Sequence, residues 1–260
     1  MPFKDQIAVI TGASSGIGWE MAKQLAQQGC HVGLIARRRE RLEALAAECR
    51  AFGVRTAVAS ADVSDREKTL AAFRAIRAEL GPIDLLIANS GIGKPTPLDP
   101  LDMALVDNMI RVNYLGVVYA VEGVLPEMLE RRKGHIAAVS SLASYKGIPG
   151  ESGYCSSKAA VNFYLEGLRI QLRNRGIAVT TVCPGFIKTP MTEVNEFPMP
   201  FVISADKAAQ KILHALARKK KVFNFPWTTS LMMRSLRWMP DWLVARIFTG
   251  LTGDRPQPPG

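Results

Sequence analysis

The sequence has few cysteines and no long apolar segment. Its four cysteines (Cys30, Cys49, Cys155 and Cys183) are far apart and form no CxxC or Cys/His cluster, so neither a disulfide framework nor a zinc site is expected. No apolar run approaches the roughly 18 residues of a membrane-spanning helix. A strand-like run begins at Ile7, which leaves no room for a signal peptide. We therefore expect a cytoplasmic protein with reduced thiols and no metal.

Acidic residues are also scarce relative to basic ones. The chain of 260 residues has 33 Lys and Arg against 23 Asp and Glu, a net charge of +10. Residues 216–260 hold eight basic and two acidic residues, so +6 of this excess belongs to the tail. A basic excess is typical of proteins that bind nucleic acid, anionic lipid or phosphorylated ligands. No nucleic-acid-binding module is recognisable, so we expect no nucleic-acid partner.

Short apolar runs alternate with helical patterns along the chain, which predicts an α/β fold. A composition of 48% hydrophobic and 22% charged residues is that of one globular domain with a sizeable core. From residue 4 to 60 the order strand, helix, strand, helix, strand indicates half of a dinucleotide-binding fold. The expected strands are Ile7–Ile10, His31–Ala36, Val54–Ala59, Ile83–Ala88, His135–Val139, Ala178–Val182 and Val222–Phe225.

A glycine-rich turn follows the first expected strand. It reads Thr11-Gly12-Ala13-Ser14-Ser15-Gly16-Ile17-Gly18, and a helical pattern follows. Glycines let the backbone approach a pyrophosphate, and the helix start offers N–H groups and a positive dipole end. The spacing Gly-x-x-x-Gly-x-Gly differs from the commoner Gly-x-Gly-x-x-Gly. Its place between a strand and a helix nevertheless indicates nucleotide binding.

The end of the second expected strand indicates which nucleotide is bound. NAD-preferring sites place an acidic residue there, whereas this chain continues with Arg37, Arg38 and Arg39. Arginine pairs with a 2′-phosphate that a carboxylate would repel, so NADP(H) is favoured. These arginines also fit a solvated first helical turn, although basic residues there oppose the helix dipole.

Polar residues recur after the other expected strands and inside one helix. Asp62 and Val63 follow the third strand, where Asp62 either caps the next helix or touches an adenine, and Ser64 is an equally good cap. The fourth strand ends in Asn89-Ser90-Gly91, at the edge where ligands bind in such sheets. Asn113 lies in a helical stretch expected from residue 100 to 131; most such amides are satisfied buried groups.

Tyr154 and Lys158 lie four positions apart in a helix expected from Ser152 to about Asn174. This spacing places both on one helical face. A fixed positive charge typically lowers a phenol pKa by about 1–3 units, which makes a tyrosine a better proton-transfer group. The same spacing also fits an inward-packed ring and a solvated ammonium.

Taken together, these residues resemble the short-chain dehydrogenase/reductase family over roughly residues 5–215. The matching elements keep the family's order: residues 11–18, Asp62-Val63, Asn89-Ser90-Gly91, Asn113, Ser141, Tyr154-x-x-x-Lys158 and Pro184-Gly185. The departures are Ala88 and Ser90, where the family usually has Asn and Ala in an Asn-Asn-Ala-Gly loop.

The resemblance implies a single-domain Rossmann fold, a doubly wound parallel sheet of about seven strands, assembled as a homodimer or homotetramer. It implies that Tyr154 exchanges a proton with a carbonyl or alcohol substrate, that Ser141 orients the reacting oxygen, and that Lys158 lowers the tyrosine pKa and holds the nicotinamide ribose. Asn113 would anchor a proton-relay water. The implied NADP(H) site comprises Gly12, Ser14, Ser15, Gly16, Ile17, Gly18, Arg37, Arg38, Asp62, Val63, Asn89, Gly91, Tyr154, Lys158, Pro184, Gly185, Ile187 and Thr189.

Two further segments carry expectations of their own. The resemblance places a substrate loop at Pro190–Ile203, and its Met191, Phe197, Met199, Pro200 and Phe201 suit either an apolar lid or a core cover. Residues 226–260 form a basic amphipathic extension to a domain of residues 1–225, with Met232, Leu236 and Met239 on one helical face. Pro240 divides it into two helices. This extension suits packing on the body or on a subunit, a place over the substrate channel, or a membrane surface.

The leading interpretation is an NADP(H)-dependent oxidoreductase that acts on an apolar carbonyl or alcohol. A non-catalytic NADP(H) sensor is the alternative, although a sensor has no need of a proton donor. The substrate, the reaction direction and the stereochemistry are not set by these residues.

Overall fold

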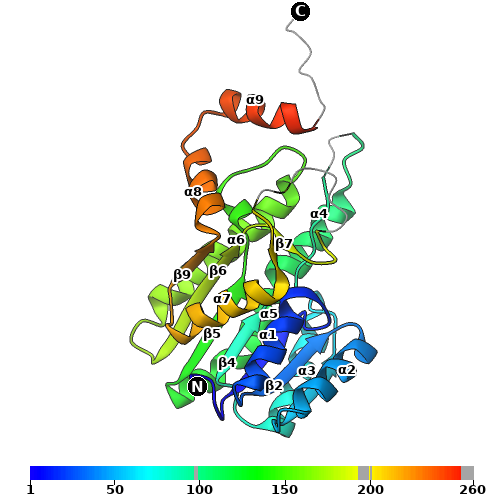
Figure 1. Cartoon of the computed structure of the whole chain (residues 1–260), viewed down its shortest axis with the longest axis vertical. Helices are drawn as coiled ribbons and strands as arrows, with labels where there is room; N and C mark the ends of the chain where they lie inside the picture. The colour runs from blue at the N-terminus through cyan, green and yellow to red at the C-terminus, as the bar shows by residue number, and fades with distance from the viewer. Residues whose placement is uncertain (97–98, 193–198, 200, 253–260) are drawn as a thin grey trace, which may run out of the picture.

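Seven parallel strands form the main sheet of the structure, a computed structural model that describes residues 1–260 except 97–98, 193–198, 200 and 253–260 (Figure 1). Their order across the sheet is β3-β2-β1-β4-β5-β6-β9. The strands are β1 Ile7–Thr11, β2 His31–Ala36, β3 Thr56–Ser60, β4 Leu85–Ala88, β5 Gly134–Val139, β6 Ile177–Pro184 and β9 Val222–Phe225. A separate pair of two-residue strands is formed by β7 Ile187–Lys188 and β8 Ile203–Ser204.

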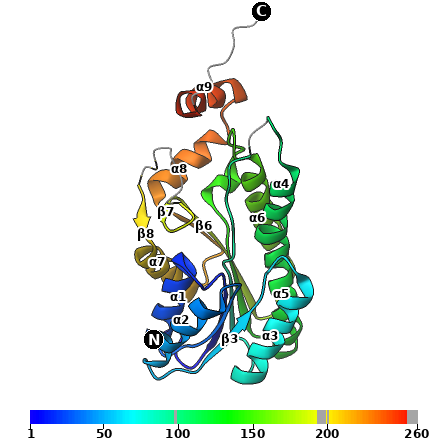
Figure 2. The ribbon, with the colours of Figure 1, turned by 90° about the vertical axis from the view of Figure 1, so that its right-hand side faces the viewer.

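Helices cover both faces of this sheet (Figure 2). One face carries α1 Gly16–Gln27, α2 Arg39–Arg50 and α7 Ala205–Ala217; the other carries α3 Arg66–Leu80, α5 Gly116–Arg131 and α6 Ser152–Gln171. Each helix layer closes its own hydrophobic core against the sheet. Strands buried on both faces read as continuous apolar runs, which explains why the strands were visible in the sequence. The doubly wound α/β fold is as predicted.

The sheet reverses its winding between β1 and β4. From β1 the chain steps outward to β2 and β3, and it then crosses back to place β4 on the other side of β1. The carboxyl ends of β1 and β4 therefore diverge into separate loops and leave a crevice between them. Ligands bind at this point in open parallel sheets.

The helix expected over residues 100–131 is interrupted. It consists of α4 Met103–Ile110, a π-helical turn Arg111–Leu115 and α5. A π turn inserts an extra residue into the hydrogen-bonding pattern of the helix. This turn is centred on Asn113, whose side chain forms hydrogen bonds with Ile92 and Ser157. The expected helical stretch is therefore present over residues 103–131, and the π turn within it was not predicted.

Neither of the two candidate caps after β3, Asp62 or Ser64, caps the next helix. Asp65 is the N-cap of α3, and its carboxylate accepts a hydrogen bond from the Lys68 amide at 3.1 Å. Asp62 instead accepts from the amide and the hydroxyl of Ser64, at 3.0 and 2.8 Å. This small turn holds Asp62 beside the crevice.

Pro240 separates two helices in the tail, as predicted: α8 Trp227–Leu236 and α9 Asp241–Thr252. The predicted packing face was wrong in one position, because Met232 is exposed whereas Met233 and Leu236 are buried. They pack against Leu142 and Cys183, which lie near the carboxyl ends of β5 and β6. Among the described residues, no helix has the length and apolarity that crossing a bilayer requires.

Candidate functional site

A cavity of about 270 Å³ opens at the winding reversal, at the carboxyl ends of the strands. Its walls come from the segments after six strands, from the π turn and from helix α6. The lining residues are Gly12, Ser14, Ser15, Gly16, Ile17, Ala36, Arg37, Arg38, Ala61, Asp62, Val63, Asn89, Ser90, Gly91, Ile92, Val112, Val139, Ser140, Ser141, Tyr154, Lys158, Pro184, Gly185, Ile187, Thr189, Pro190, Met191 and Thr192. The fold thus brings together all but two of the predicted site residues, Gly18 and Asn113.

The glycine-rich turn forms the floor of one half of the cavity. Gly12 has a φ of +68°, and a Cβ there would lie 2.8 Å from the Cα of Ser90, so a side chain would both strain the backbone and clash. Helix α1 begins at Gly16 with no acidic residue in its first turn. The open helix start and the absence of negative charge fit an anion such as a pyrophosphate.

Gly18 lies behind this turn and does not line the cavity. A Cβ at position 18 would lie 2.5 Å from the Gly12 carbonyl oxygen and 2.6 Å from the Asn89 amide nitrogen. The glycine therefore allows α1 to pack closely on the end of β1. Its contact with a cofactor stays a prediction.

Hydrogen bonds between the ends of β1 and β4 hold the crevice open in one shape. The Thr11 hydroxyl accepts from the backbone amides of Asn89 and Ser90, at 3.0 and 3.1 Å. The Asn89 side chain donates to the carbonyls of Thr11 and Gly12, at 3.1 and 3.3 Å. Asn89 is therefore a brace between the two loops as well as part of the wall.

The arginines after β2 form the rim of the same half. Arg38 reaches across to the glycine-rich turn and donates to the hydroxyls of Ser14 and Ser15, at 2.8 and 2.9 Å. Arg37 is more exposed, and its guanidinium lies 3.9 Å from the Asp62 carboxylate, a long and loosely held pair. This rim therefore presents positive charge, and no carboxylate follows β2 directly.

Ser141, Tyr154 and Lys158 line the other half of the cavity. Burial raises the pKa of Tyr154 to about 12, and a side-chain hydrogen bond to Ser141 opposes part of that rise. Burial lowers the pKa of Lys158 to about 8, and the nearby Cys183 offsets only part of that fall. Its ammonium donates to the Val139 carbonyl at 3.1 Å and lies 5.8 Å from the centre of the Tyr154 ring.

The expected lowering of the Tyr154 pKa by Lys158 is not found: burial raises this pKa instead. Spacing in sequence placed the two groups on one helical face correctly. At 5.8 Å from the ring centre, however, the ammonium does not offset the loss of hydration around the phenol. Tyr154 therefore holds its proton at neutral pH.

Asn113 lies behind the cavity wall and is fully buried. Its amide donates to the Ile92 carbonyl at 2.8 Å and to the Ser157 hydroxyl at 2.9 Å, and its oxygen accepts from the Ile92 amide at 2.8 Å. These bonds tie the π turn and α6 to the loop after β4. Asn113 thus positions the backbone around Tyr154 and Lys158 through these hydrogen bonds, although it does not itself line the cavity.

The segment after β6 closes the cavity on its remaining side. Pro184, Gly185, Ile187 and Thr189 line it as predicted, and Met191 does so from the expected substrate loop. Phe197 and Pro200 of that loop lie outside the described residues. Phe201 is exposed and does not line the cavity, and Ile203 belongs to β8.

A protein-family model for short chain dehydrogenases matches residues 6–197, which include every residue that lines the cavity. The chain belongs to the short-chain dehydrogenase family. It is 38% identical over 234 residues to an uncharacterized oxidoreductase of Myxococcus xanthus, covering 90% of this chain and 92% of that protein. It is 30% identical over 240 residues to human 17-beta-hydroxysteroid dehydrogenase 13, covering 91% of this chain and 80% of the relative.

Solved structures agree with this assignment. The crystal structure of levodione reductase superposes with a TM-score of 0.81 at 26% identity, covering 88% of this chain and 99% of that one. An alcohol dehydrogenase from the archaeon Thermococcus sibiricus, complexed with 5-hydroxy-NADP, has a TM-score of 0.76 at 29% identity and covers 85% and 94%. The chain is therefore an oxidoreductase of this family.

Sequence reasoning missed the apolar part of the wall. Ile92 and Val112 line the cavity, yet in sequence they are indistinguishable from core residues. Ser90, also in the wall, was placed at the ligand-binding edge from the sequence but was not included among the predicted site residues. The one available signal was position: residues directly after a central parallel strand lie at the ligand-binding edge.

Proposed function

We propose that this short-chain dehydrogenase is an NADP(H)-dependent enzyme that interconverts an apolar carbonyl compound and its alcohol. One observation carries the proposal: Ser141, Tyr154 and Lys158 face the same cavity as the glycine-rich turn and the two arginines after β2. A nicotinamide nucleotide bound along this cavity supplies or accepts the hydride. The protein supplies position, charge and a proton.

Tyr154 is the proposed proton donor in reduction and proton acceptor in oxidation. Its pKa of about 12 keeps the phenol protonated at neutral pH, the form that donates to a carbonyl oxygen. Ser141 would hold that oxygen through its hydroxyl. Lys158 would bind the nicotinamide ribose and supply positive charge when the phenolate forms.

The preference for NADP(H) over NAD(H) rests on charge at the end of β2. Arg37 and Arg38 line the cavity there, and arginine makes strong charge-assisted hydrogen bonds to phosphate. The solved alcohol dehydrogenase of Thermococcus sibiricus is complexed with an NADP derivative, which supports the same choice. The remaining cofactor-site residues predicted from the sequence are proposed to contact the nucleotide, with Gly18 in its packing role.

An apolar substrate is proposed from the wall beside Tyr154. Ile92, Val112 and Met191 line the cavity, and ligand sites are mostly hydrophobic with a few fixed polar groups. Within the part of the chain that the structure describes, the lining residues all lie before position 193, so we propose residues 1–225 as the catalytic domain. Residues 226–260 are then an extension with a separate role.

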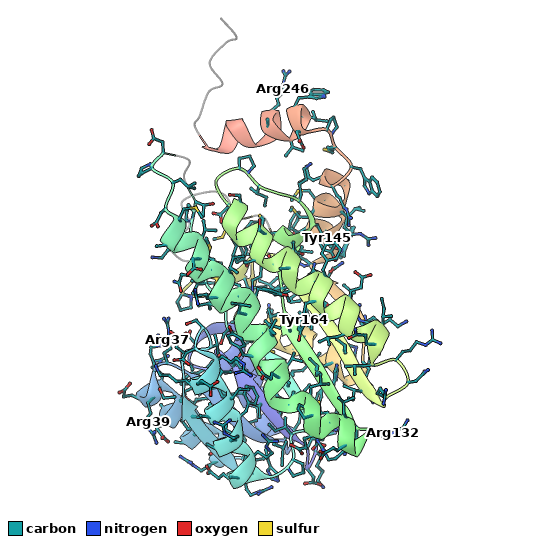
Figure 3. The ribbon with its side chains drawn as sticks, turned by 180° about the vertical axis from the view of Figure 1, so that it is seen from behind. Arg37, Arg39, Arg132, Tyr145, Tyr164 and Arg246 are labelled. Atoms are coloured by element: carbon teal, nitrogen blue, oxygen red, sulfur yellow. The ribbon has the colours of Figure 1, made fainter. Side chains whose placement is uncertain are left out.

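The test is to follow NADPH oxidation across a panel of aldehydes, ketones, quinones and steroidal carbonyls. Tyr154→Phe should lower turnover by roughly a hundred- to ten-thousandfold, the usual contribution of general acid–base catalysis, while NADPH still binds. Tyr164→Phe is the matched control, because Tyr164 lies on the same helix and packs edge-to-face on Tyr114 with ring centres 6.1 Å apart (Figure 3). It should retain full turnover.

Two results would contradict the proposal. Retained turnover in Tyr154→Phe would remove that residue from the chemistry. Tight NADPH binding without turnover of any carbonyl in the panel would favour the sensor alternative.

A further inference from the structure

Helix α8 and the turn that follows it carry a row of exposed tryptophan and leucine side chains. Trp227, Leu231 and Trp238 are 75%, 64% and 86% exposed. Trp227 and Leu231 are four residues apart and lie on one side of α8, and Trp238 lies in the turn directly after the helix. Trp242 on α9 is also largely exposed, so three of the four tryptophans in the chain are in solvent within the tail.

This row has no part in holding the fold together. The buried side of α8 consists of Thr229, Ser230, Met233 and Leu236, and Met233 and Leu236 pack on Leu142 and Cys183. Single exposed apolar residues are common on protein surfaces. Three large ones in one row opposite a packed face mark a docking surface.

Positive charge accompanies the apolar row. Arg234 and Arg237 both lie between Leu231 and Trp238 in the sequence. Within the described residues, neither arginine forms an ion pair. Both line a groove of about 400 Å³ with Tyr145, Val222, Asn224 and Trp238. The acidic residue of the tail that is described, Asp241, pairs with Lys146 at 2.9 Å, so it does not neutralise them.

The surface lies at the end of the molecule that holds the cavity. Figures 1 and 2 place α8, α9 and the start of α4 beyond the carboxyl ends of the strands, and Figure 3 shows Arg246 pointing outward from α9. Leu101 and Met103, at the start of α4, are exposed there as well. Apolar side chains and arginines therefore share one end of the protein.

We propose that α8 and α9 dock this protein on an anionic lipid surface. Tryptophan and arginine together suit the boundary between headgroups and acyl chains, because the rings enter the apolar layer while the guanidinium groups remain at the phosphates. A second copy fits less well. An interface between two identical faces would bring the unpaired arginines of both copies together. Docking on lipid through α8 and α9 would also turn the end of the protein that holds the cavity toward the apolar layer of the membrane.

The experiment measures sedimentation of the full chain with vesicles of phosphatidylcholine, alone or mixed with phosphatidylserine. We expect binding to the anionic vesicles and a blue shift of tryptophan fluorescence. Each basic residue near such a surface contributes about fivefold in affinity. The double variant Arg234→Gln/Arg237→Gln should therefore bind about thirtyfold more weakly. Trp227→Ser/Trp238→Ser should lose most of both the binding and the spectral shift.

The matched control is Arg173→Gln/Arg175→Gln, which removes the same charge. These residues lie between α6 and β6, at the amino end of the sheet and away from α8, so this variant should bind like the parent. NADPH binding checks the folding of every variant. Equal binding to neutral and anionic vesicles, equal loss in both charge variants, or a changed oligomer mass in the tryptophan variant would each overturn the proposal; the last would make this face a subunit contact.

Discussion

Arg37, Arg38 and Arg39 are consecutive in the sequence, yet the structure gives them three different surroundings. Arg38 is held by hydroxyls of the glycine-rich turn. Arg39 points along α2 to Glu43, at 3.3 Å. Arg37 lines the cavity with a largely exposed side chain and only a 3.9 Å contact with Asp62. Arg37 is therefore the arginine with the most freedom to turn toward a 2′-phosphate, while Arg38 mainly fixes the loop beside it.

Arg37→Ala should weaken NADPH binding by roughly ten- to hundredfold and leave NADH binding almost unchanged. A hydrogen bond to a charged group contributes about 1.5–3 kcal/mol, and NADH lacks the phosphate that would accept it. The measurement is a fluorescence titration with each nucleotide. Arg39→Ala removes the same charge two residues further on, at the first residue of α2 and outside the cavity, and should change neither affinity. Equal weakening of NADPH and NADH by Arg37→Ala would argue against phosphate recognition.

Tyr154 and Lys158 show what the sequence can predict at the scale of single residues. The motif Tyr154-x-x-x-Lys158 identified two groups that share a cavity, because four-residue spacing on a helix fixes their common face. It did not predict the direction of the Tyr154 pKa, since that depends on how much water and charge the folded chain leaves around the phenol. Sequence neighbours do not contain that information.

At the scale of elements, the buried strands were predicted best, because burial on both faces leaves a continuous apolar run. The π turn at Arg111–Leu115 was not predicted, since it depends on Asn113 bonding to Ile92 and Ser157 across the fold. Helix α8 shows the same limit. Leu231, Met232 and Met233 are consecutive apolar residues, so periodicity alone does not choose which one is buried. Met233 is the buried residue because it packs against Leu142, which lies far from α8 in the sequence.

His135 links strand β5 to β6 and to the approach to β9. Its Nε2 lies 2.8 Å from the Thr180 hydroxyl, which itself donates to the Lys220 carbonyl at 2.6 Å. That hydroxyl has one proton to give, so His135 is the donor and is neutral with its proton on Nε2. Burial lowers its pKa from 6.5 to about 4. Protonation of His135 therefore opposes the folded state.

The free energy of unfolding should fall as the pH drops from about 6.5 to about 4. In this window the unfolded chain takes up a proton at His135 that the folded chain does not, so stability is greatest above the window and is lost on acidification. The contribution is roughly 3 kcal/mol at about 1.36 kcal/mol per pKa unit. Urea unfolding across this pH range measures it.

Two substitutions separate titration of His135 from its hydrogen bond. His135→Gln should flatten most of the acid dependence, whatever its stability at mildly alkaline pH. Thr180→Val breaks the same contact but keeps the imidazole, so the acid dependence should remain. An unchanged pH slope in His135→Gln would assign the acid sensitivity to other groups.

At the scale of the whole molecule, the outer face of α6 provides a second surface without a partner in the single chain. Phe163 and Ile170 are 72% and 71% exposed on this helix, seven residues apart and hence on one side. Between them, Gly167 has no atom within 4 Å of the position that a Cβ would take, which permits close approach of another helix. We propose that this face joins two copies into a homodimer, or into half of a homotetramer.

Phe163→Asp/Ile170→Asp should convert the assembly to smaller particles, detected by light scattering after size-exclusion chromatography. An interface around a two-fold axis places the same patch on both subunits, so the double variant introduces four buried carboxylates that the partner helix does not neutralise. Phe52→Asp is the control, because Phe52 is an exposed apolar residue after α2, away from α6, and should leave the mass unchanged. A parent protein that is monomeric, or a double variant of unchanged mass, would contradict this interface.

Because α6 and the α8–α9 end are separate surfaces (Figure 2), loss of the dimer should halve the number of lipid-docking faces per particle. Weaker vesicle binding with intact arginines would then result from lost avidity, whereas the arginine variants should weaken binding without any change in mass.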